Sequence, residues 1–450
     1  ACAARVGRSE RMTVSRNGRN AFVLGGGVAG LAAAFGLADR GFRVTLLESR
    51  GWLGGRAFSS VDRATGLRLD NGPHLMLGCY RAMRTLLRRL GTEGHFLQQQ
   101  RLAVAYRTAD GRLQRLELSR WPVPLSMPWA LLRLGLPIGG WCRALFGLLA
   151  VVLGAPPPWS LADWMQRRGQ RGAPDAFLWR PLCRAIMNTE PEEAAAADYL
   201  AALREAFTGR ASAAALWLPR RPWGEILADA APQALAAAGV TVRAGARVVG
   251  FVGATRIDAI ELADGRRLDV APADLVVSAL PWFALRCLVP AAAAAFGGLR
   301  SSPIVTAYFE TAIGAPVLPD EGPIVALVGG DPFHFVLRTP GADLRQFALL
   351  SGGNRSFDGM NVDAIAKAAM GQLQRYYAAV PMAGATVRIR KEQHATFVAA
   401  PGAPSLRPVP GRLAAGPENL LVCGDWTATR LPATLEGAAR SAAAMLLALD

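Results

Sequence analysis

The chain has 450 residues, 52% of them hydrophobic, which exceeds the usual size of one hydrophobic core, and no stretch of about 20 apolar residues suits a membrane-spanning helix. The formal net charge is +16, but nearly all of the positive charge is arginine scattered along the chain, with Lys367 and Lys391 the only lysines. The length of the chain favours two domains. The scattered arginine argues against nucleic acid as a partner and is compatible with an anionic membrane surface as a partner.

The N-terminal segment, residues 1–20, is basic. It contains five arginines but no apolar core of the kind that a secretion signal needs, so we expect a disordered extension. The six cysteines of the chain lie far apart without a Cys-x-x-Cys pair. Their spacing argues against a metal site or a disulfide framework and favours a reducing cytoplasm, whereas the oligomeric state stays open.

The first structured unit combines two strands, a glycine turn and a helix. An apolar strand over 21–24 is followed by Gly25-Gly26-Gly27-Val28-Ala29-Gly30, a helix over 31–40 and a strand over 44–47. This order is typical of a βαβ unit that binds a dinucleotide. Glu48 ends the second strand and is expected to bind the adenosine ribose, which favours FAD or NAD over a cofactor with a 2′-phosphate.

The glycine turn fits the pattern G-x-G-x-x-G at Gly25, Gly27 and Gly30. Glycine at these positions permits the tight turn, the close approach of a pyrophosphate and the packing of the helix on the strand. Because the helix begins near Val28 and Ala29, its free N–H groups and its positive dipole end point at the phosphates.

The segment 121–161 differs in composition from the rest of the chain. It is dense in Leu, Trp and Pro, and Arg133 and Arg143 interrupt it. Two interpretations stay open. The segment is either an ordinary helical core or a membrane-facing surface that lies in the interface without crossing the bilayer.

Strand patterns return in the second half of the chain. Residues 240–280 alternate apolar and polar side chains around the turn Asp264-Gly265, which predicts β-ribbons, and we expect Val248 in this region to contact the cofactor. Residues 303–309 and 324–328 predict strands of a separate sheet over the substrate. A strand over 419–423 and a helix over about 434–449 close the chain.

Directly after the βαβ unit comes Leu53-Gly54-Gly55-Arg56-Ala57-Phe58-Ser59. This segment resembles the second signature of the amine oxidase and phytoene desaturase superfamily. The resemblance implies FAD rather than NAD as the cofactor. It also implies that Gly55 and Arg56 lie beside the flavin diphosphate.

Near the C-terminus, Gly424-Asp425-Trp426 resembles the last FAD motif of the same superfamily. The resemblance implies that Gly424 and Asp425 bind the ribityl or phosphate region. It further implies that the following helix faces the flavin with its N-terminus, where Leu435 and Gly437 lie.

Three longer segments carry a narrower resemblance: Asp70-Asn71-Gly72-Pro73-His74-Leu75-Met76-Leu77-Gly78-Cys79-Tyr80, Pro181-Leu182-Cys183 with Asn188-Thr189, and Asp425-Trp426-Thr427-Ala428-Thr429 through Pro432-Ala433-Thr434-Leu435-Glu436-Gly437-Ala438. They resemble the squalene-associated FAD-dependent desaturases, which are identified as hydroxysqualene dehydroxylases. The likeness covers about residues 20–450. The family usually has glutamine where this chain has Pro73, so a role for that amide is in doubt.

The resemblance implies an α/β fold, with a discontinuous Rossmann-type FAD-binding domain and a mixed α+β substrate domain like those of amine oxidases and phytoene desaturases. We expect the FAD-binding domain to comprise 21–72, 236–292 and 412–450. The substrate domain then comprises 73–235 and 293–411, with the membrane-facing candidate inside it.

The implied reaction removes the hydroxyl group of hydroxysqualene reductively to give squalene, a precursor of hopanoids and other triterpenoids. Such a reaction needs a hydride from reduced flavin, one acid and a dry apolar site for an isoprenoid substrate. His74 is our hypothesis for the acid because imidazole titrates near neutrality, with Asn71 as a second catalytic candidate. The alternative is that His74 only binds backbone. NADPH or a redox partner would supply the electrons.

Three other functions compete with this one. A carotenoid-type desaturase would share fold and cofactor, because glycine loops do not determine the direction of electron flow. A flavin amine oxidase is disfavoured, because neither lysine lies in a matching motif and Lys391 is expected at an exposed strand end. A non-catalytic flavin-binding protein or membrane scaffold is supported only by the basic charge. His95, His334 and His394 are expected on the surface or in packing, and Cys423 in packing.

Overall fold

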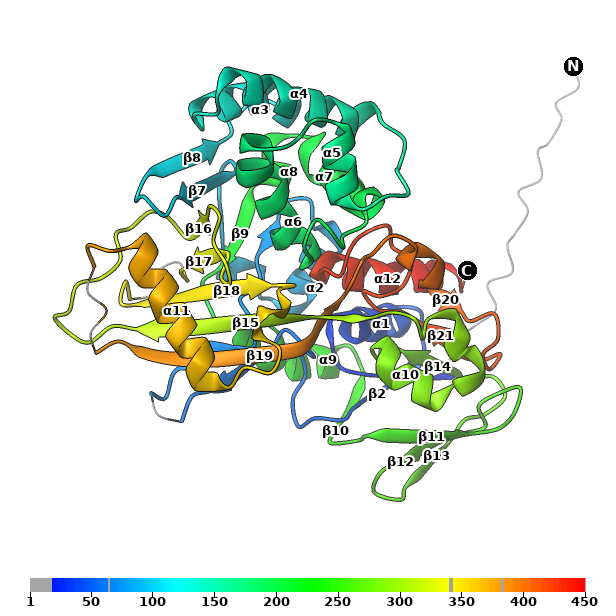
Figure 1. The fold of residues 1–450 in the computed structure, drawn as a ribbon. Coiled ribbons are helices and arrows are strands. Elements are labelled where there is room, and N and C mark those ends of the chain that lie inside the picture. Colours follow the sequence, from blue (N-terminus) through cyan, green and yellow to red (C-terminus); the bar gives the residue numbers. More distant parts are fainter. Residues whose placement is uncertain (1–17, 64, 340–342, 381, 383, 450) are drawn as a thin grey trace, which may run out of the picture.

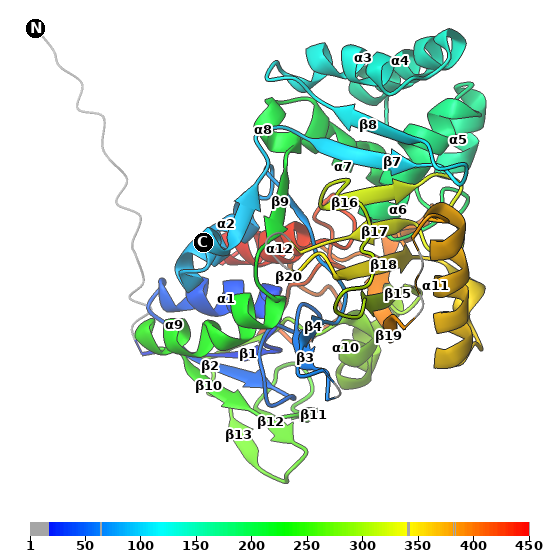
Figure 2. The same ribbon diagram turned by 90° about the vertical axis from the view of Figure 1, so that its left-hand side faces the viewer.

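The computed structural model describes residues 18–63, 65–339, 343–380, 382 and 384–449. Most of the predicted N-terminal extension, residues 1–17, lies outside the described residues. Figures 1 and 2 place a mostly parallel sheet and neighbouring hairpins towards one end of the molecule, and a layer of helices at the opposite end. A second large sheet lies between these ends.

A six-stranded sheet carries the predicted βαβ unit. Its strands lie in the order β10, β2, β1, β14, β21 and β20, and all neighbours are parallel except β20 and β21. This order is that of a Rossmann sheet with one antiparallel edge strand, which confirms the predicted fold class. The strands are β1 (Asn20–Leu24), β2 (Arg43–Glu48), β10 (Thr241–Ala244), β14 (Leu275–Ser278), β20 (Gly411–Arg412) and β21 (Leu420–Val422).

Helix α1 (Val28–Ala38) packs against α12 (Leu435–Leu447) and against strands of this sheet (Figure 1). The helix begins at Val28, as the glycine-turn motif predicted, and thus three residues before the alanine-rich pattern over 31–40. β14 is buried along its whole length, so its sequence is a continuous apolar run rather than an alternating one. Cys423 is also fully buried in this core, as expected.

The predicted β-ribbons form a separate antiparallel sheet of β11 (Val248–Val252), β12 (Ala259–Leu262) and β13 (Arg267–Asp269). The turn Asp264-Gly265 joins β12 to β13, and Gly265 has a positive φ of 84° that favours glycine. This part of the prediction is confirmed. In both views the sheet lies at the end of the molecule opposite α3 and α4 (Figures 1 and 2).

The second large sheet has seven strands in the order β19, β15, β18, β17, β16, β7 and β8. Its strands are β7 (Ala103–Arg107), β8 (Leu113–Glu117), β15 (Ser301–Glu310), β16 (Ile324–Leu327), β17 (Phe335–Leu337), β18 (Gln346–Gly352) and β19 (Thr386–Phe397). Helix α11 (Val362–Tyr376) packs against it (Figure 2). The two predicted strands therefore do belong to a sheet separate from the Rossmann sheet.

The expected position of Lys391 at an exposed strand end is wrong. Lys391 lies within the 12-residue strand β19, opposite Val305 of β15, and is half-buried. Its Nζ donates a hydrogen bond of 2.8 Å to the carbonyl of Phe357. The ammonium group therefore links the short helix η5 (Arg355–Phe357) to the sheet. Lys391 is not at a strand end because β19 is longer than its polar sequence suggested.

Six helices build the layer at the far end of the molecule, and α3 and α4 are the outermost of them (Figures 1 and 2). The helices are α3 (Val123–Arg133), α4 (Ile138–Leu153), α5 (Leu161–Arg167), α6 (Arg180–Met187), α7 (Ala196–Phe207) and α8 (Ala211–Ala214). Segment 121–161 thus forms α3 and α4. In each helix one face is part of the core, where Leu131 and Ala144 are fully buried, and the other face is exposed.

The remaining elements connect these layers. The strands are β3 (Ser59–Val61), β4 (Arg68–Asp70), β5 (Met76–Leu77), β6 (Phe96–Gln98) and β9 (Leu216–Pro219). The helices are α2 (Arg81–Leu90), α9 (Ala231–Ala237), α10 (Trp282–Leu288), η1 (Glu93–His95), η2 (Asp175–Trp179), η3 (Gly224–Asp229), η4 (Pro290–Ala295) and η6 (Ala403–Leu406). Of all helices in the described part of the chain, none has the length and apolar character that crossing a bilayer requires.

Candidate functional site

The glycine turn between β1 and α1 has the geometry that its motif predicts. Gly25 has a φ of +98°, and its N–H donates a hydrogen bond of 2.8 Å to the carbonyl of Leu47. A Cβ atom on Gly30 would lie 1.8 Å from the carbonyl oxygen of Gly25. The turn can therefore close only if Gly30 has no side chain.

The segment with Gly55 lies against this turn. The N–H of Gly54 donates a hydrogen bond of 2.8 Å to the carbonyl of Gly26, and a Cβ on Gly55 would lie 2.9 Å from the Cα of Gly27. Gly27 is the N-cap residue of α1, and no side chain accepts a hydrogen bond from the first N–H groups of the helix at this position. The first turn of α1 contains no acidic residue. The two glycine segments thus leave the helix N-terminus, with Val28 and Ala29 in its first turn, open to an anion such as a diphosphate.

Glu48 is held at the end of β2, next to the glycine turn. One carboxylate oxygen, Oε2, accepts a hydrogen bond of 2.7 Å from the N–H of Gly26, and Oε1 accepts one of 2.8 Å from the N–H of Arg50. The Glu48 carbonyl accepts a hydrogen bond of 2.8 Å from Ala246, two residues before Val248. The structure therefore brings Glu48 and the start of β11 together, as required for a shared nucleotide site.

Arg56 and Asp425 meet although they are 369 positions apart. The Nη2 of Arg56 lies 2.6 Å from the Oδ1 of Asp425, and its Nη1 donates a hydrogen bond of 2.9 Å to the carbonyl of Ala395 at the end of β19. Asp425 is only 5% exposed. The pair therefore joins the segment after the βαβ unit, the segment before α12 and the second large sheet at one point.

The helix N-terminus implied by the last motif is also present. Thr434 is the N-cap of α12, and its Oγ1 accepts a hydrogen bond of 2.9 Å from the N–H of Gly437. Leu435 begins the helix directly after the cap. In the same turn, the buried carboxylate of Glu436 accepts hydrogen bonds from the N–H groups of Ala82 and Met83 in α2.

Arg407, which no sequence motif marks, holds the segment that carries Asp425. It is 6% exposed, and its Nη2 donates hydrogen bonds to the carbonyls of Thr427 at 2.5 Å and Leu431 at 2.7 Å. Its Nη1 lies 3.7 Å from the Oδ2 of Asp198 in α7. The guanidinium thereby shapes the loop between β21 and α12. Sequence reasoning had no signal for it among so many arginines.

The side chain of His74 is half-buried. Its ring packs edge-on against Trp223 with 5.8 Å between ring centroids, and its Nδ1 is buried without a hydrogen-bond partner among the described residues. Burial lowers the pKa of His74 to about 4; a hydrogen bond with the Gly72 backbone opposes this effect, and the positive charge of Arg56 adds to it. The imidazole is therefore neutral at pH 7.

The neighbours of His74 in the motif are held in place by polar contacts. The Nδ2 of Asn71 donates a hydrogen bond of 2.7 Å to Oε2 of Glu392 in β19. The Oδ1 of Asp70 accepts hydrogen bonds from Ser59 at 2.6 Å and from the N–H of Trp223 at 2.8 Å, while burial raises the pKa of Asp70 to about 6. Asp70 therefore joins the β3–β4 hairpin to η3, and Asn71 joins the motif to the second large sheet.

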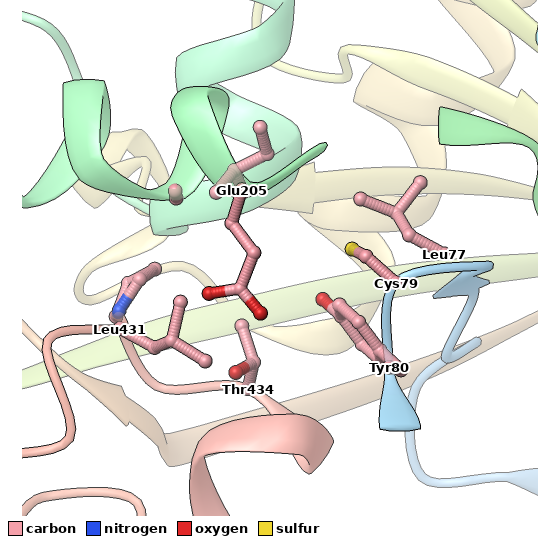
Figure 3. A pocket seen from close by; sticks show the side chains of 9 residues that line it. Leu77, Cys79, Tyr80, Glu205, Leu431 and Thr434 are labelled. Carbon is pink, nitrogen blue, oxygen red and sulfur yellow. The ribbon is translucent and has the colours of Figure 1, made fainter. Parts of the chain in front are cut away.

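A small pocket lies at the N-terminus of α12 (Figure 3). It is lined by Leu77, Cys79, Tyr80, Ile186, Ala202, Glu205, Leu431, Pro432 and Thr434. Figure 3 shows Glu205 reaching toward the side of the pocket where Cys79 and Tyr80 lie. Burial raises the pKa of the Cys79 thiol to about 12, so this thiol is neutral and unreactive at pH 7.

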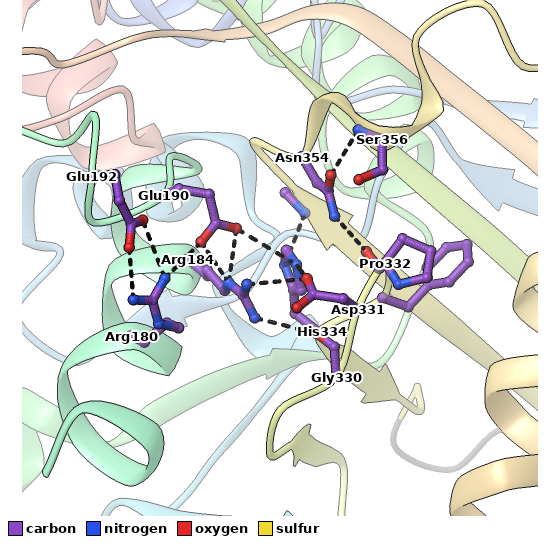
Figure 4. Close-up of polar contacts among 12 residues, drawn as sticks. Arg180, Arg184, Glu190, Glu192, Gly330, Asp331, Pro332, His334, Asn354 and Ser356 are labelled. Atoms are coloured by element: carbon purple, nitrogen blue, oxygen red, sulfur yellow. Dashed lines mark hydrogen bonds and ion pairs between the residues drawn. The ribbon is translucent and has the colours of Figure 1, made fainter. Parts of the chain in front are cut away.

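A second polar cluster lies where α6 meets the loop after β16 (Figure 4). The Nε of Arg184 lies 2.9 Å from Oε1 of Glu190, and its Nη2 lies 3.1 Å from Oδ1 of Asp331. His334 is buried beside them, 3.5 Å from Asp331, and burial lowers its pKa. His334 is therefore a packing residue, as expected, but it packs within a charged cluster. His95 and His394 lie at the surface or half-exposed.

The comparisons with known proteins agree with this geometry. A family profile described as flavin containing amine oxidoreductase matches residues 28–444. Two curated relatives named hydroxysqualene dehydroxylase come from Rhodopseudomonas palustris and Sinorhizobium fredii. The relative from Rhodopseudomonas palustris is 30% identical, over 93% of this chain and 95% of its own chain. The relative from Sinorhizobium fredii is 28% identical, over 94% of this chain and 96% of its own chain. A 15-cis-phytoene desaturase from Glycine max is 29% identical over 39% of this chain and 32% of its own.

Solved structures show the same fold at low sequence identity. An oxidoreductase from Methanosarcina mazei has a TM-score of 0.71 and 16% identity, and the similarity covers 96% of this chain and 99% of that one. A putrescine oxidase has a TM-score of 0.67 and 14% identity, and the similarity covers 96% of this chain and 98% of that one. Because the similarity in fold extends over nearly the whole chain, the glycine turn, Arg56 and Asp425 lie in a fold that flavin oxidases share.

Proposed function

The chain belongs to the flavin containing amine oxidoreductases, as an FAD-dependent oxidoreductase related along its length to the hydroxysqualene dehydroxylases, and we propose that it reductively removes the hydroxyl group of hydroxysqualene to give squalene. The observation that carries this proposal is the 30% identity over 93% of the chain to a relative of that name. Plant desaturases match a much smaller part of the chain, which favours dehydroxylation over desaturation.

The residues present fit FAD. The open N-terminus of α1 between Gly27 and Gly55 suits the diphosphate, and we propose that Glu48, held next to the glycine turn, binds the adenosine ribose. We propose that Arg56 neutralises diphosphate charge and that Asp425 binds the ribityl or phosphate region. Val248, Gly424, Leu435 and Gly437 complete the proposed cofactor site.

When bound and reduced, FAD supplies the hydride that replaces the hydroxyl group, which leaves as water after taking up a proton. We propose NADPH as the external reductant. The residues of the chain then have three tasks: to hold the cofactor, to exclude water from an apolar substrate, and to deliver the proton to the leaving oxygen. We propose His74 for the proton transfer, because its Nδ1 has no hydrogen-bond partner among the described residues, and Asn71 for orientation.

We also propose a cytoplasmic location. The exposed thiols of Cys142 and Cys287 support it, because free exposed thiols persist in a reducing compartment. The proposed substrate is a long isoprenoid and therefore dissolves in lipid rather than in water.

The proposed reaction has a direct test. Holoenzyme reduced anaerobically, either chemically or with NADPH, is mixed with hydroxysqualene, and the products are separated and identified. We expect squalene in an amount equal to the flavin oxidised. Oxidised holoenzyme is the control and is expected to give none. Conversion of phytoene to a desaturated product, without squalene from hydroxysqualene, would instead assign a carotenoid-type desaturase.

His74→Ala tests the proton donor. We expect this variant to keep FAD and its thermal stability but to lose about 10²- to 10⁴-fold in turnover, as is typical when a general acid is removed. In the wild type, a donor with a pKa near 4 is protonated in only about 0.1% of molecules at pH 7. That fraction grows about tenfold with each pH unit of acidification.

The pH dependence of turnover distinguishes two functions for His74. If the imidazolium donates the proton, turnover rises as the pH falls from 8 to 6, and His74→Ala loses this rise. If neutral His74 only orients the substrate, the wild-type profile is flat over this range. Normal turnover of His74→Ala with FAD bound would remove the acid assignment altogether.

A further inference from the structure

The outward face of α4 is apolar. Ile138, Phe146, Leu149 and Leu153 recur at helical spacing and are exposed, Phe146 to 71%. The opposite face consists of small residues and one valine that are buried against the helices beneath: Gly140, Ala144, Gly147 and Val151. A helix on the surface of a soluble protein normally directs polar side chains to water. α4 instead has an apolar face on each side.

Helix α3 repeats this arrangement beside α4. Leu125, Trp129 and Leu132 are exposed, Trp129 to 67%, although Met127 and Leu131 of the same helix are buried. The Nε1 of Trp141 in α4 donates a hydrogen bond of 2.8 Å to the carbonyl of Pro128, which fixes the two helices together. We call this surface the α3–α4 face; it comprises Trp121, Leu125, Trp129, Leu132, Ile138, Phe146, Leu149, Val152 and Leu153.

The charged side chains within the segment that forms the α3–α4 face have one sign. Residues 118–162 contain no aspartate or glutamate, and their only charged side chains, Arg120, Arg133 and Arg143, are all exposed. A contiguous apolar surface with exposed aromatic side chains and a rim of arginine matches an anionic bilayer interface, where apolar groups enter the acyl boundary and guanidinium groups meet lipid phosphates.

We propose that the α3–α4 face rests on the surface of an anionic phospholipid bilayer, with both helices lying in the interface. This inference rests on the proposed function, because a long isoprenoid substrate is stored in that bilayer. Figures 1 and 2 place α3 and α4 as the outermost layer at one end of the molecule, so a flat surface can reach them without meeting the other elements that the structure describes.

The lengths of the two helices and the charge of the chain favour a bilayer surface over a transmembrane position or a second copy of the chain. α3 has 11 residues and α4 has 16, which span only about 16 Å and 24 Å, so neither crosses a hydrocarbon core of about 30 Å. A second copy of the chain would bring the arginine rims of two +16 molecules together, with no acidic side chain within residues 118–162 to offset them. A lipid surface with negative headgroups supplies the missing opposite charge.

The test is cosedimentation of full-length holoenzyme with vesicles of phosphatidylcholine alone or mixed with phosphatidylglycerol. We expect binding to the anionic vesicles, and a loss of about tenfold or more in the partition coefficient for Trp129→Asp/Phe146→Asp. The matched control, Ile313→Asp/Val409→Asp, changes two exposed apolar residues elsewhere, Ile313 being 89% exposed, and should bind like the wild type. Arg133→Gln/Arg143→Gln should weaken binding to anionic vesicles and leave binding to neutral ones unchanged.

Equal binding of the wild type and of Trp129→Asp/Phe146→Asp would overturn the proposal. A second result would also overturn it: the wild type does not bind vesicles, forms a dimer in sedimentation equilibrium, and loses this dimer when the two substitutions are made. The face would then pair with a second copy of the chain. Turnover separates this inference from the reaction itself. The double variant should match the wild type on detergent-dispersed hydroxysqualene and fall behind only when the substrate is in vesicles. Vesicle binding by a wild type that converts no hydroxysqualene would support the surface and contradict the reaction.

Discussion

Replacing Gly27 by alanine is expected to leave the protein folded while weakening FAD binding by about 100-fold, or ~2.7 kcal/mol. The backbone at Gly27 has a φ of −77°, which alanine adopts freely, and the added methyl group would lie 3.7 Å from its nearest neighbour, the Cα of Gly55. The methyl group would therefore fit between protein atoms. It would occupy the space through which the diphosphate approaches the N-terminus of α1.

The measurement is titration of the FAD-free variant with FAD, followed by flavin fluorescence, together with thermal unfolding of the same samples. Gly51→Ala is the matched control, since no described residue apart from its two chain neighbours lies within 4 Å of the added Cβ. Gly30→Ala marks the other limit, because its Cβ would collide with the backbone of Gly25 and should impair folding itself. Wild-type affinity in Gly27→Ala would contradict the proposed position of the diphosphate.

Arg407→Met is expected to lower the free energy of unfolding of the holoenzyme by about 3–5 kcal/mol. Methionine fills a similar apolar volume but leaves the carbonyl of Leu431 without its donor and the carbonyl of Thr427 with only the N–H of Thr429. It also leaves Asp198 as a buried carboxylate without its cation. Because the same loop leads from Asp425 to α12, FAD affinity should fall as well. Urea unfolding at saturating FAD gives the first quantity, and titration with FAD gives the second.

Two further variants make the Arg407 result specific. Arg412→Met removes an exposed arginine from the neighbouring strand β20 and should change stability by no more than about 0.5 kcal/mol. Adding Asp198→Asn to Arg407→Met should restore part of the loss, because the unpaired buried charge is then removed. A loss below about 1 kcal/mol in Arg407→Met would show that water or other donors satisfy the loop.

The FAD motifs could be predicted from the sequence because each works through local backbone geometry. Gly25, Gly27 and Gly30 are needed for a turn of a few residues, and Glu48 follows at the end of the next strand, so spacing alone determined their relation. The alternation around Asp264-Gly265 predicted the ribbons for the same reason. The resemblance of short segments added FAD as the cofactor and the family, and both are now shown by the comparisons.

Contacts between distant segments could not be predicted in this way. The pairing of Arg56 with Asp425, the burial of Arg407 among the carbonyls of one loop, and the position of Lys391 within β19 depend on how sheets and loops meet. The same holds for His74. Its sequence context suggested a group that titrates near neutrality, but burial lowers its pKa to about 4.

The sequence by itself determined the cofactor turn, the βαβ unit that contains it and the apolar character of residues 121–161, because these depend on neighbours along the chain. Only the tertiary structure decided which side chains share the site, which charges are buried, and that α3 and α4 direct one apolar face inward and the other to the surface. The physical reason is that burial and charge pairing depend on distances in space. Segments hundreds of residues apart set those distances when they pack.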